Sequence, residues 1–97
     1  MSKETAGTLA RKMGFSPLRS QPGSYFKSEP SLFDGKPVGL ILSIVRARSL
    51  GKFHFSIATD GGATAARGMG AAHEIERCIF AALVMHEAHE LRKEAGA

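Results

Sequence analysis

The chain lacks several features that would mark a specialised class of protein. It has no tryptophan and one cysteine, Cys78. A single cysteine cannot form an intrachain disulfide, and the lack of disulfides is typical of proteins in reducing compartments. Its longest apolar run, residues 78–85, is far shorter than the roughly 20 residues that a membrane-spanning helix needs. The first residues hold no apolar segment of the signal-peptide kind. These absences predict a soluble, cytoplasmic protein.

Charge is modest and unevenly distributed. The chain has 13 Lys and Arg against nine Asp and Glu, which gives a formal net charge of +4. Residues 1–60 hold nine of these basic and four of these acidic residues, so the basic excess lies in this part. A bias of this size permits a nucleic acid or an acidic protein surface as partner, but it is too small to require either. With 43% hydrophobic residues, the composition predicts one folded domain, residues 1–97.

Hydrophobic spacing in the first part of the chain predicts a helix and then a weak strand. Apolar residues at helical spacing predict a short helix over residues 3–13, which Gly14 can end. Residues 24–28, SYFKS, predict a short strand. We expect that strand at a sheet edge, because Pro30 follows it and proline cannot join a central ladder.

The strongest strand signal comes from two alternating segments, residues 38–48 and 53–59. The residues between them, SLGK, contain glycine and suit a tight turn, so the pair predicts a β-hairpin. One face of this hairpin is aliphatic and aromatic and predicts core. The other face is small and mixed, and is either solvated or meets a partner. The residues expected in the core are Val38, Leu40, Leu42, Ile44, Phe53, Phe55 and Ile57.

The last part of the chain predicts a long helix. Residues 60–70 are rich in glycine and predict a connector, followed by a helix over residues 71–95, with a start near residue 63 as the alternative. The order of elements predicts an α+β domain. It has a short N-terminal helix, a small antiparallel sheet with a strong β-hairpin, and a long C-terminal helix packed on the sheet.

The long helix is apolar on two sides. Ile75, Ile79 and Ala82 mark the side that can cover the sheet, and Phe80, Val84 and Leu91 mark the opposite side. Because the N-terminal helix is short and its apolar side chains are mostly small, a second copy of the chain is the better cover for this opposite side. The sequence therefore predicts a homodimer through these three residues.

Residues 86–90, HEAHE, raise the question of a metal site. His86 and His89 stand three residues apart, whereas a zincin helix needs a spacing of four. Two histidines one turn apart can share a metal, but the sequence offers no convincing third ligand. A solvated helix surface is the favoured interpretation, and a metal-binding protein stays as an alternative.

The chain resembles two families of nucleic-acid-binding proteins in part. Residues 9–20, LARKMGFSPLRS, resemble the turn of a helix-turn-helix DNA reader, but Pro22 and Gly23 would end the recognition helix after about one turn. The helix–sheet–helix order is similar to that of double-stranded RNA-binding domains, whose last helix begins with a basic cluster. Only Arg67 stands near that place here, so neither family is inferred.

Motifs for catalysis are lacking. The glycine-rich residues 61–70 have neither the P-loop ending nor the dinucleotide spacing. Ser43 and Ser56 have His54 as a possible neighbour but no orienting acid, which a catalytic triad requires. Cys78 lies in an apolar run and is interpreted as core. We therefore predict a protein without enzymatic activity and without a cofactor.

The basic hairpin is the most distinctive surface feature. Arg46, Arg48 and Lys52 gather at its tip, where they can contact phosphates or an acidic protein surface. The leading hypothesis is a small binding protein that docks on nucleic acid through this hairpin. The alternative is a protein-binding regulator or inhibitor of the kind that phages and mobile elements encode. The candidate binding residues are Arg46, Arg48, Lys52, Arg19, Lys27 and Arg67.

Overall fold

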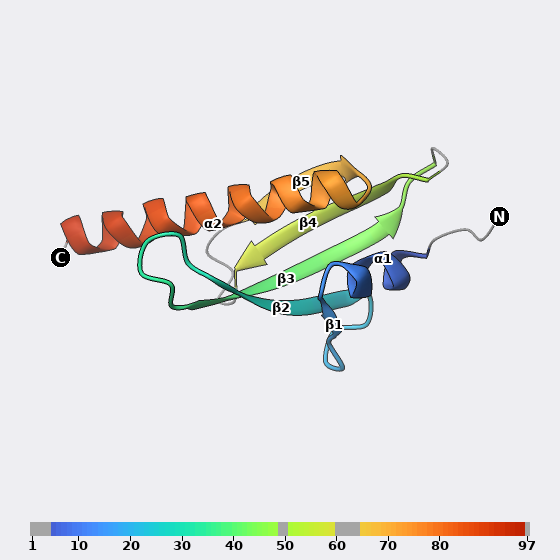
Figure 1. The fold of residues 1–97 in the computed structure, drawn as a ribbon, viewed down its shortest axis with the longest axis horizontal. Coiled ribbons are helices and arrows are strands. Elements are labelled where there is room, and N and C mark those ends of the chain that lie inside the picture. Colours follow the sequence, from blue (N-terminus) through green and yellow to red (C-terminus); the bar gives the residue numbers. More distant parts are fainter. Residues whose placement is uncertain (1–4, 49–50, 60–64, 97) are drawn as a thin grey trace.

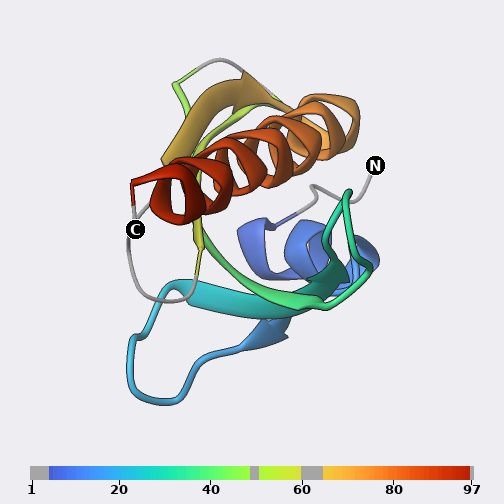
Figure 2. The ribbon, with the colours of Figure 1, turned by 90° about the vertical axis from the view of Figure 1, so that its left-hand side faces the viewer.

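A computed structural model describes residues 5–48, 51–59 and 65–96 of the chain. Five antiparallel strands form one sheet in the order β1-β2-β3-β4-β5, and the sheet curves around two helices that lie on the same side of it (Figures 1 and 2). This architecture confirms the predicted α+β class. The elements are α1 Ala6–Lys12, β1 Ser16–Pro17, β2 Ser24–Pro30, β3 Pro37–Arg46, β4 Phe53–Thr59, β5 Ala65–Gly70 and α2 Ala72–Ala95.

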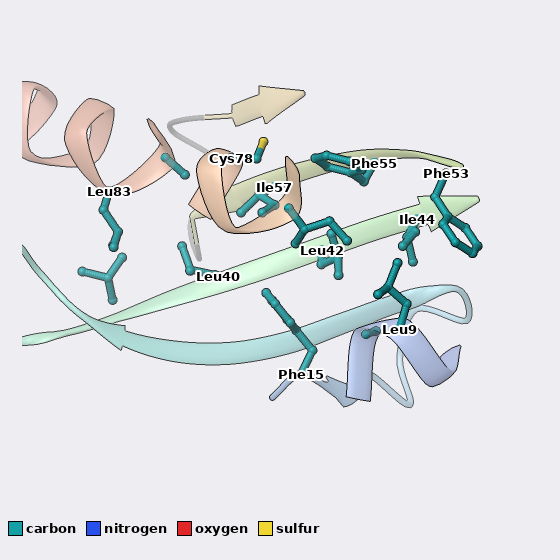
Figure 3. Packing of buried hydrophobic residues seen from close by; sticks show 14 residues of the cluster. Leu9, Phe15, Leu40, Leu42, Ile44, Phe53, Phe55, Ile57, Cys78 and Leu83 are labelled. Carbon is teal, nitrogen blue, oxygen red and sulfur yellow. The ribbon is translucent and has the colours of Figure 1, made fainter. Parts of the chain in front are cut away.

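The core lies between the helices and the concave face of the sheet. Successive side chains of a strand point to opposite faces, and in β3 the even-numbered residues point inward, with Leu40 and Leu42 fully buried. Leu42 pairs with Ile57 of β4, which is also fully buried. Figure 3 shows side chains of α1, α2 and these strands meeting in one cluster. All seven hydrophobic residues expected in the core of the hairpin are buried.

The first helix is capped and anchored by polar contacts. Thr8 donates its backbone N–H to the Thr5 hydroxyl over 3.1 Å, which satisfies one of the unpaired donors of the first turn. Leu9 is buried and packs in the cluster that includes β3. At the other end, the ammonium group of Lys27 donates to the carbonyl of Met13 over 2.9 Å. The predicted helix is confirmed from residue 6 to residue 12.

The second strand is only partly at an edge. Its first half pairs with the short strand β1 through Ser16 and Phe26, and through Pro17 and Tyr25. The expectation of an edge strand is therefore wrong for Tyr25 and Phe26 but correct for residues 27–30, which have β3 on one side only. The signal for β1 was weak because two residues show no periodicity.

The structure corrects the prediction of a connector after β4. Residues 65–70 form an edge strand, β5, that pairs with β4 from Ala58 to Phe53. Alanine and glycine are poor strand formers, so propensity gave no signal here. Packing requires these small residues: a Cβ added to Gly68 would lie 3.0 Å from the ring of Phe55.

The junction between β5 and α2 depends on one glycine and one carboxylate. Gly70 has φ of +149°, and a Cβ at this position would come within 2.5 Å of the Glu74 side chain. Glu74 accepts a hydrogen bond from the backbone N–H of Ala71 over 3.0 Å, which lowers the pKa of its carboxyl. The helix then runs to residue 95, as predicted. No helix in the described part of the chain has a stretch long and apolar enough to cross a membrane.

Candidate functional site

The convex face of the sheet carries no helix and is called the open face here. Strand register aligns polar side chains across it: Ser24 pairs with Ser43, Ser43 with Ser56, and Ser56 with Arg67. Since neighbouring strands lie about 4.8 Å apart, this row spans roughly 14 Å. The hydroxyl oxygens of Ser24 and Ser43 lie 3.4 Å apart. Three hydroxyls and a guanidinium can thus contact one elongated ligand.

Apolar and aromatic side chains flank this polar row. On one side, His54 pairs with Val45 and with Met69. Val45 is 62% exposed and Met69 is 48% exposed. On the other side, Phe26 and Ile41 are paired and half-buried. The three serines of the row, with Val45 and His54, line a shallow hollow of about 420 Å³, and Arg67 is not part of its lining.

The open face is free of carboxylates over its described residues. The acidic side chains of the described chain lie elsewhere: Glu29 on the concave face of β2, Asp34 in the turn before β3, and the remaining ones on α2. An anionic ligand on the open face would therefore meet the positive charge of Arg67, while Glu74 of α2 lines a hollow with Arg67 at the β5 edge of the sheet. The residues of this face are Ser24, Phe26, Ser28, Gly39, Ile41, Ser43, Val45, His54, Ser56, Ala58, Arg67 and Met69.

The basic tip of the β3–β4 hairpin lies at the end of the sheet, where Arg46 pairs with Phe53 on the concave side. Its backbone is closed by a hydrogen bond from the N–H of Ala47 to the carbonyl of Lys52, 3.0 Å long. The guanidinium of Arg46 lies 5.8 Å from the centre of the Phe53 ring, a cation–π distance that holds this side chain against the end of the core. Arg48 and Lys52 are exposed. The cluster of three cations stays a prediction, and in it Arg46 is held by Phe53.

Two further candidate cations, Arg67 and Arg19, lie outside the hairpin tip. Arg67 is three residues from Gly70, which pairs with Phe53 at the base of the tip, so it lies roughly 10 Å along the sheet from that base. Arg19 is exposed in the turn between β1 and β2, at the end of the sheet where β3 reaches the tip. Arg67 is therefore on the strand next to the hairpin, whereas Arg19 is in a turn at the β1 edge of the sheet, which Figures 1 and 2 show well away from the β3–β4 tip.

Lys27 is placed elsewhere. It lies on the concave face, pairs with Leu40, and stands six residues, or roughly 20 Å, along the sheet from Arg46. Its ammonium group contacts the carbonyl of Met13 and lies 2.6 Å from the carboxylate of Glu29. The expectation that Lys27 lies near the hairpin tip is wrong, because this side chain anchors the end of α1.

The two histidines of the HEAHE segment do not form a metal site with other described residues. His86 and His89 are half-buried on α2. Among residues 5–48, 51–59 and 65–96, no three His, Cys, Asp or Glu side chains are grouped so that they can hold a metal ion. His54 lies on the opposite side of the sheet and cannot supply the missing ligand. Cys78 is buried in the core, and burial raises the pKa of its thiol.

A separate cleft of about 330 Å³ lies between the turn at residues 31–36 and the C-terminal half of α2. Asp34 lines this cleft, and the pKa of its carboxyl is lowered chiefly by a hydrogen bond from the Ser31 hydroxyl. On the helix side, the lining includes Glu87, Glu90 and Glu94. This cleft is acidic, so it does not suit the same ligand as the open face.

The outer side of α2 is uncovered. The three residues predicted at a dimer interface, Phe80, Val84 and Leu91, are between 43% and 60% exposed. The helix α1 packs on β3 and β1 and does not cover them. Burial on both sides of α2 is therefore not achieved within one chain.

Sequence reasoning missed that β5 adds Arg67 and Met69 to the open face. A signal for this strand was present: small residues at positions 66, 68 and 70 alternate with the larger Arg67 and Met69. That alternation is the period of a strand. It was hidden because the small side is built of alanine and glycine instead of large hydrophobic residues.

The whole chain was compared with known proteins. No family model, no curated protein and no solved structure matches it.

Proposed function

We propose that this protein binds single-stranded nucleic acid along the open face of its sheet, with the basic hairpin tip contacting phosphates. The observation that supports this most is the row Ser24–Ser43–Ser56–Arg67, on a face without carboxylates among its described residues and next to Arg48 and Lys52. Phosphate contacts in such complexes come mainly from Arg, Lys and hydroxyl side chains.

The flanking residues favour a single strand over a duplex. An exposed sheet surface binds unpaired bases by stacking them on aromatic side chains, as in the common four-stranded RNA-binding module. His54 and Phe26 offer rings on either side of the polar row. A duplex would instead need an element that enters a groove, and α2, the only long helix of the described chain, carries acidic residues on its exposed side.

The test is fluorescence anisotropy with random single-stranded and double-stranded DNA and RNA at low and physiological salt. The double substitution Arg46→Ala and Arg48→Ala removes two cations of the tip, and Arg67→Ala removes the cation of the row. We expect each to weaken single-strand binding by roughly tenfold or more, since a lost charge-assisted hydrogen bond costs about 1.5–3 kcal/mol. Each lost phosphate contact also lowers the slope of log affinity against log salt by about 0.7.

A matched control separates site effects from net charge. Arg92→Ala with Lys93→Ala removes the same two charges from the exposed C-terminal end of α2. We expect that control to bind nearly as well as the wild type. Equal losses in control and tip variants would indicate non-specific attraction, and no binding at low salt would contradict the proposal.

A second function is favoured by Val45 and Met69, whose exposure is unusual for a face that only contacts nucleic acid. A protein partner with an acidic and apolar surface would bury them and meet Arg67, which suits a regulator or inhibitor. In that case Val45→Asp would abolish binding of the partner, and nucleic-acid affinity would be absent in the wild type.

A further inference from the structure

The outer side of α2 has a regular pattern along its length. Residues 77, 80, 84, 87, 91 and 94 follow one another at spacings of three and four, which is the heptad spacing of a coiled-coil seam. Phe80, Val84 and Leu91 are apolar and exposed, and Glu87 stands between Val84 and Leu91 in the middle of the seam. The ends carry opposite charges, Arg77 near the start of the helix and Glu94 near its end.

These charges decide the orientation of a second helix. In an antiparallel pair centred between residues 84 and 87, Arg77 of one copy faces Glu94 of the other, and Phe80 faces Leu91. A parallel pair in register would place Arg77 against Arg77 and Glu94 against Glu94, which is unfavourable. In the antiparallel pair Glu87 faces Val84, whereas in the parallel pair it would face Glu87 of the other copy. The charged residues of the seam therefore favour the antiparallel arrangement of a two-fold dimer.

We propose that two copies of the chain associate through an antiparallel pairing of α2 along this seam. The exposed Phe33 extends the apolar surface, because it is 78% exposed and lines the same cleft as Leu91. Ala81 and Ala88 lie beside the seam and allow the two helices to approach closely. The occupant is a second copy, since Arg77 and Glu94 at the two ends of the seam pair with each other when one copy is reversed.

The dimer is independent of the nucleic-acid proposal, because the seam lies on α2, which packs on the concave side of the sheet, opposite the open face. Both open faces of the dimer stay accessible, so each proposal can fail while the other holds. A dimer would present two hairpin tips and two open faces to a long ligand, which raises the apparent affinity for it.

Sedimentation velocity on the full chain, from low to high micromolar concentration, tests the association. We expect a species of twice the 10.3 kDa chain mass. Phe80→Asp with Val84→Asp should give a monomer with an unchanged thermal unfolding curve per chain at low concentration, because both side chains are exposed. The proposal is overturned by a monomeric wild type, or by a dimer that these substitutions leave intact.

Charge exchange tests the antiparallel orientation. Arg77→Glu alone and Glu94→Arg alone should each weaken the dimer roughly tenfold, since two symmetric pairs become repulsive. The double variant restores both pairs with the signs exchanged, and should regain wild-type affinity. An additive loss in the double variant would contradict the pairing of these two positions.

Disulfide trapping gives a second readout. Phe80→Cys with Leu91→Cys should crosslink two chains on mild oxidation, because these positions face each other. Leu91→Cys alone should not, since the two copies of residue 91 lie roughly 17 Å apart along an antiparallel pair, beyond disulfide reach. The wild type is the control, as its buried Cys78 stays unreacted. Crosslinking of the single variant would instead show a parallel pair.

Discussion

The two faces of the sheet come from the same strands but differ in what they contact. In β3, Leu40, Leu42 and Ile44 point toward the helices and are buried. The alternate residues Ser43 and Val45 point to the open face and are exposed. Strict alternation thus lets one strand stabilise the fold with half of its side chains and leaves the other half for recognition.

The largest expected difference in stability is between substitution of a core residue and substitution of its neighbour on the open face. Leu42 is fully buried, so Leu42→Ala should lower the free energy of unfolding by about 2–5 kcal/mol, through lost burial and the cavity left behind. Ile41 is half-buried on the open face, and Ile41→Ala should cost less than about 1.5 kcal/mol. Urea unfolding of both variants measures the difference. Equal losses would show that the open face is covered in solution.

Lys27 and Arg67 are cations on opposite faces of the sheet, and substitution of each should affect a different property. Lys27 donates to the Met13 carbonyl and pairs with Glu29, so Lys27→Met should destabilise the fold by roughly 1 kcal/mol while its apolar stem is kept. Arg67→Met should change stability by less than about 0.5 kcal/mol, because the side chain is exposed. Thermal unfolding and nucleic-acid anisotropy together check this. The assignment fails if Lys27→Met weakens binding without changing stability.

The sequence was sufficient for the elements with a clear period. Alternation over residues 38–45 and 53–59 identified the hairpin and its core face, and the helical spacing of Ile75, Ile79 and Ala82 identified the face of α2 that packs on it. These elements were predictable because their large apolar side chains are buried on one side only. Apolar and polar residues therefore alternate along the sequence with the same period as burial.

The sequence was insufficient where pairing with a neighbour creates the element. β5 is a strand because β4 offers it a free edge, and its own residues favour no strand. The candidate site depended on that missed strand: Arg67 was recognised as a cation, but its row with Ser24, Ser43 and Ser56 follows from the register of four strands. Lys27 was misplaced for the same reason, since period alone does not say which face of a weak strand packs inward.

The smallest expected effect on stability is at the junction between β5 and α2. Glu74 accepts the N–H of Ala71, which stabilises its charged form and lowers the pKa of the carboxyl below its usual value of 4.5. A lowered pKa means that the stabilisation is present above about pH 4.5 and is lost as pH falls through the folded-state pKa. Glu74→Gln keeps an acceptor that does not titrate.

We therefore compare urea midpoints of the wild type and Glu74→Gln at neutral pH and near pH 3. The wild type should be slightly more stable at neutral pH, because a charged acceptor near a helix start is favoured by the exposed N–H groups there. The difference should shrink as pH falls through the folded-state pKa of Glu74. Asp34, whose pKa is also lowered, titrates in both proteins and cancels from the comparison. A difference that persists unchanged in acid would mean that the carboxylate charge contributes nothing at this junction and that only the shape of the side chain matters.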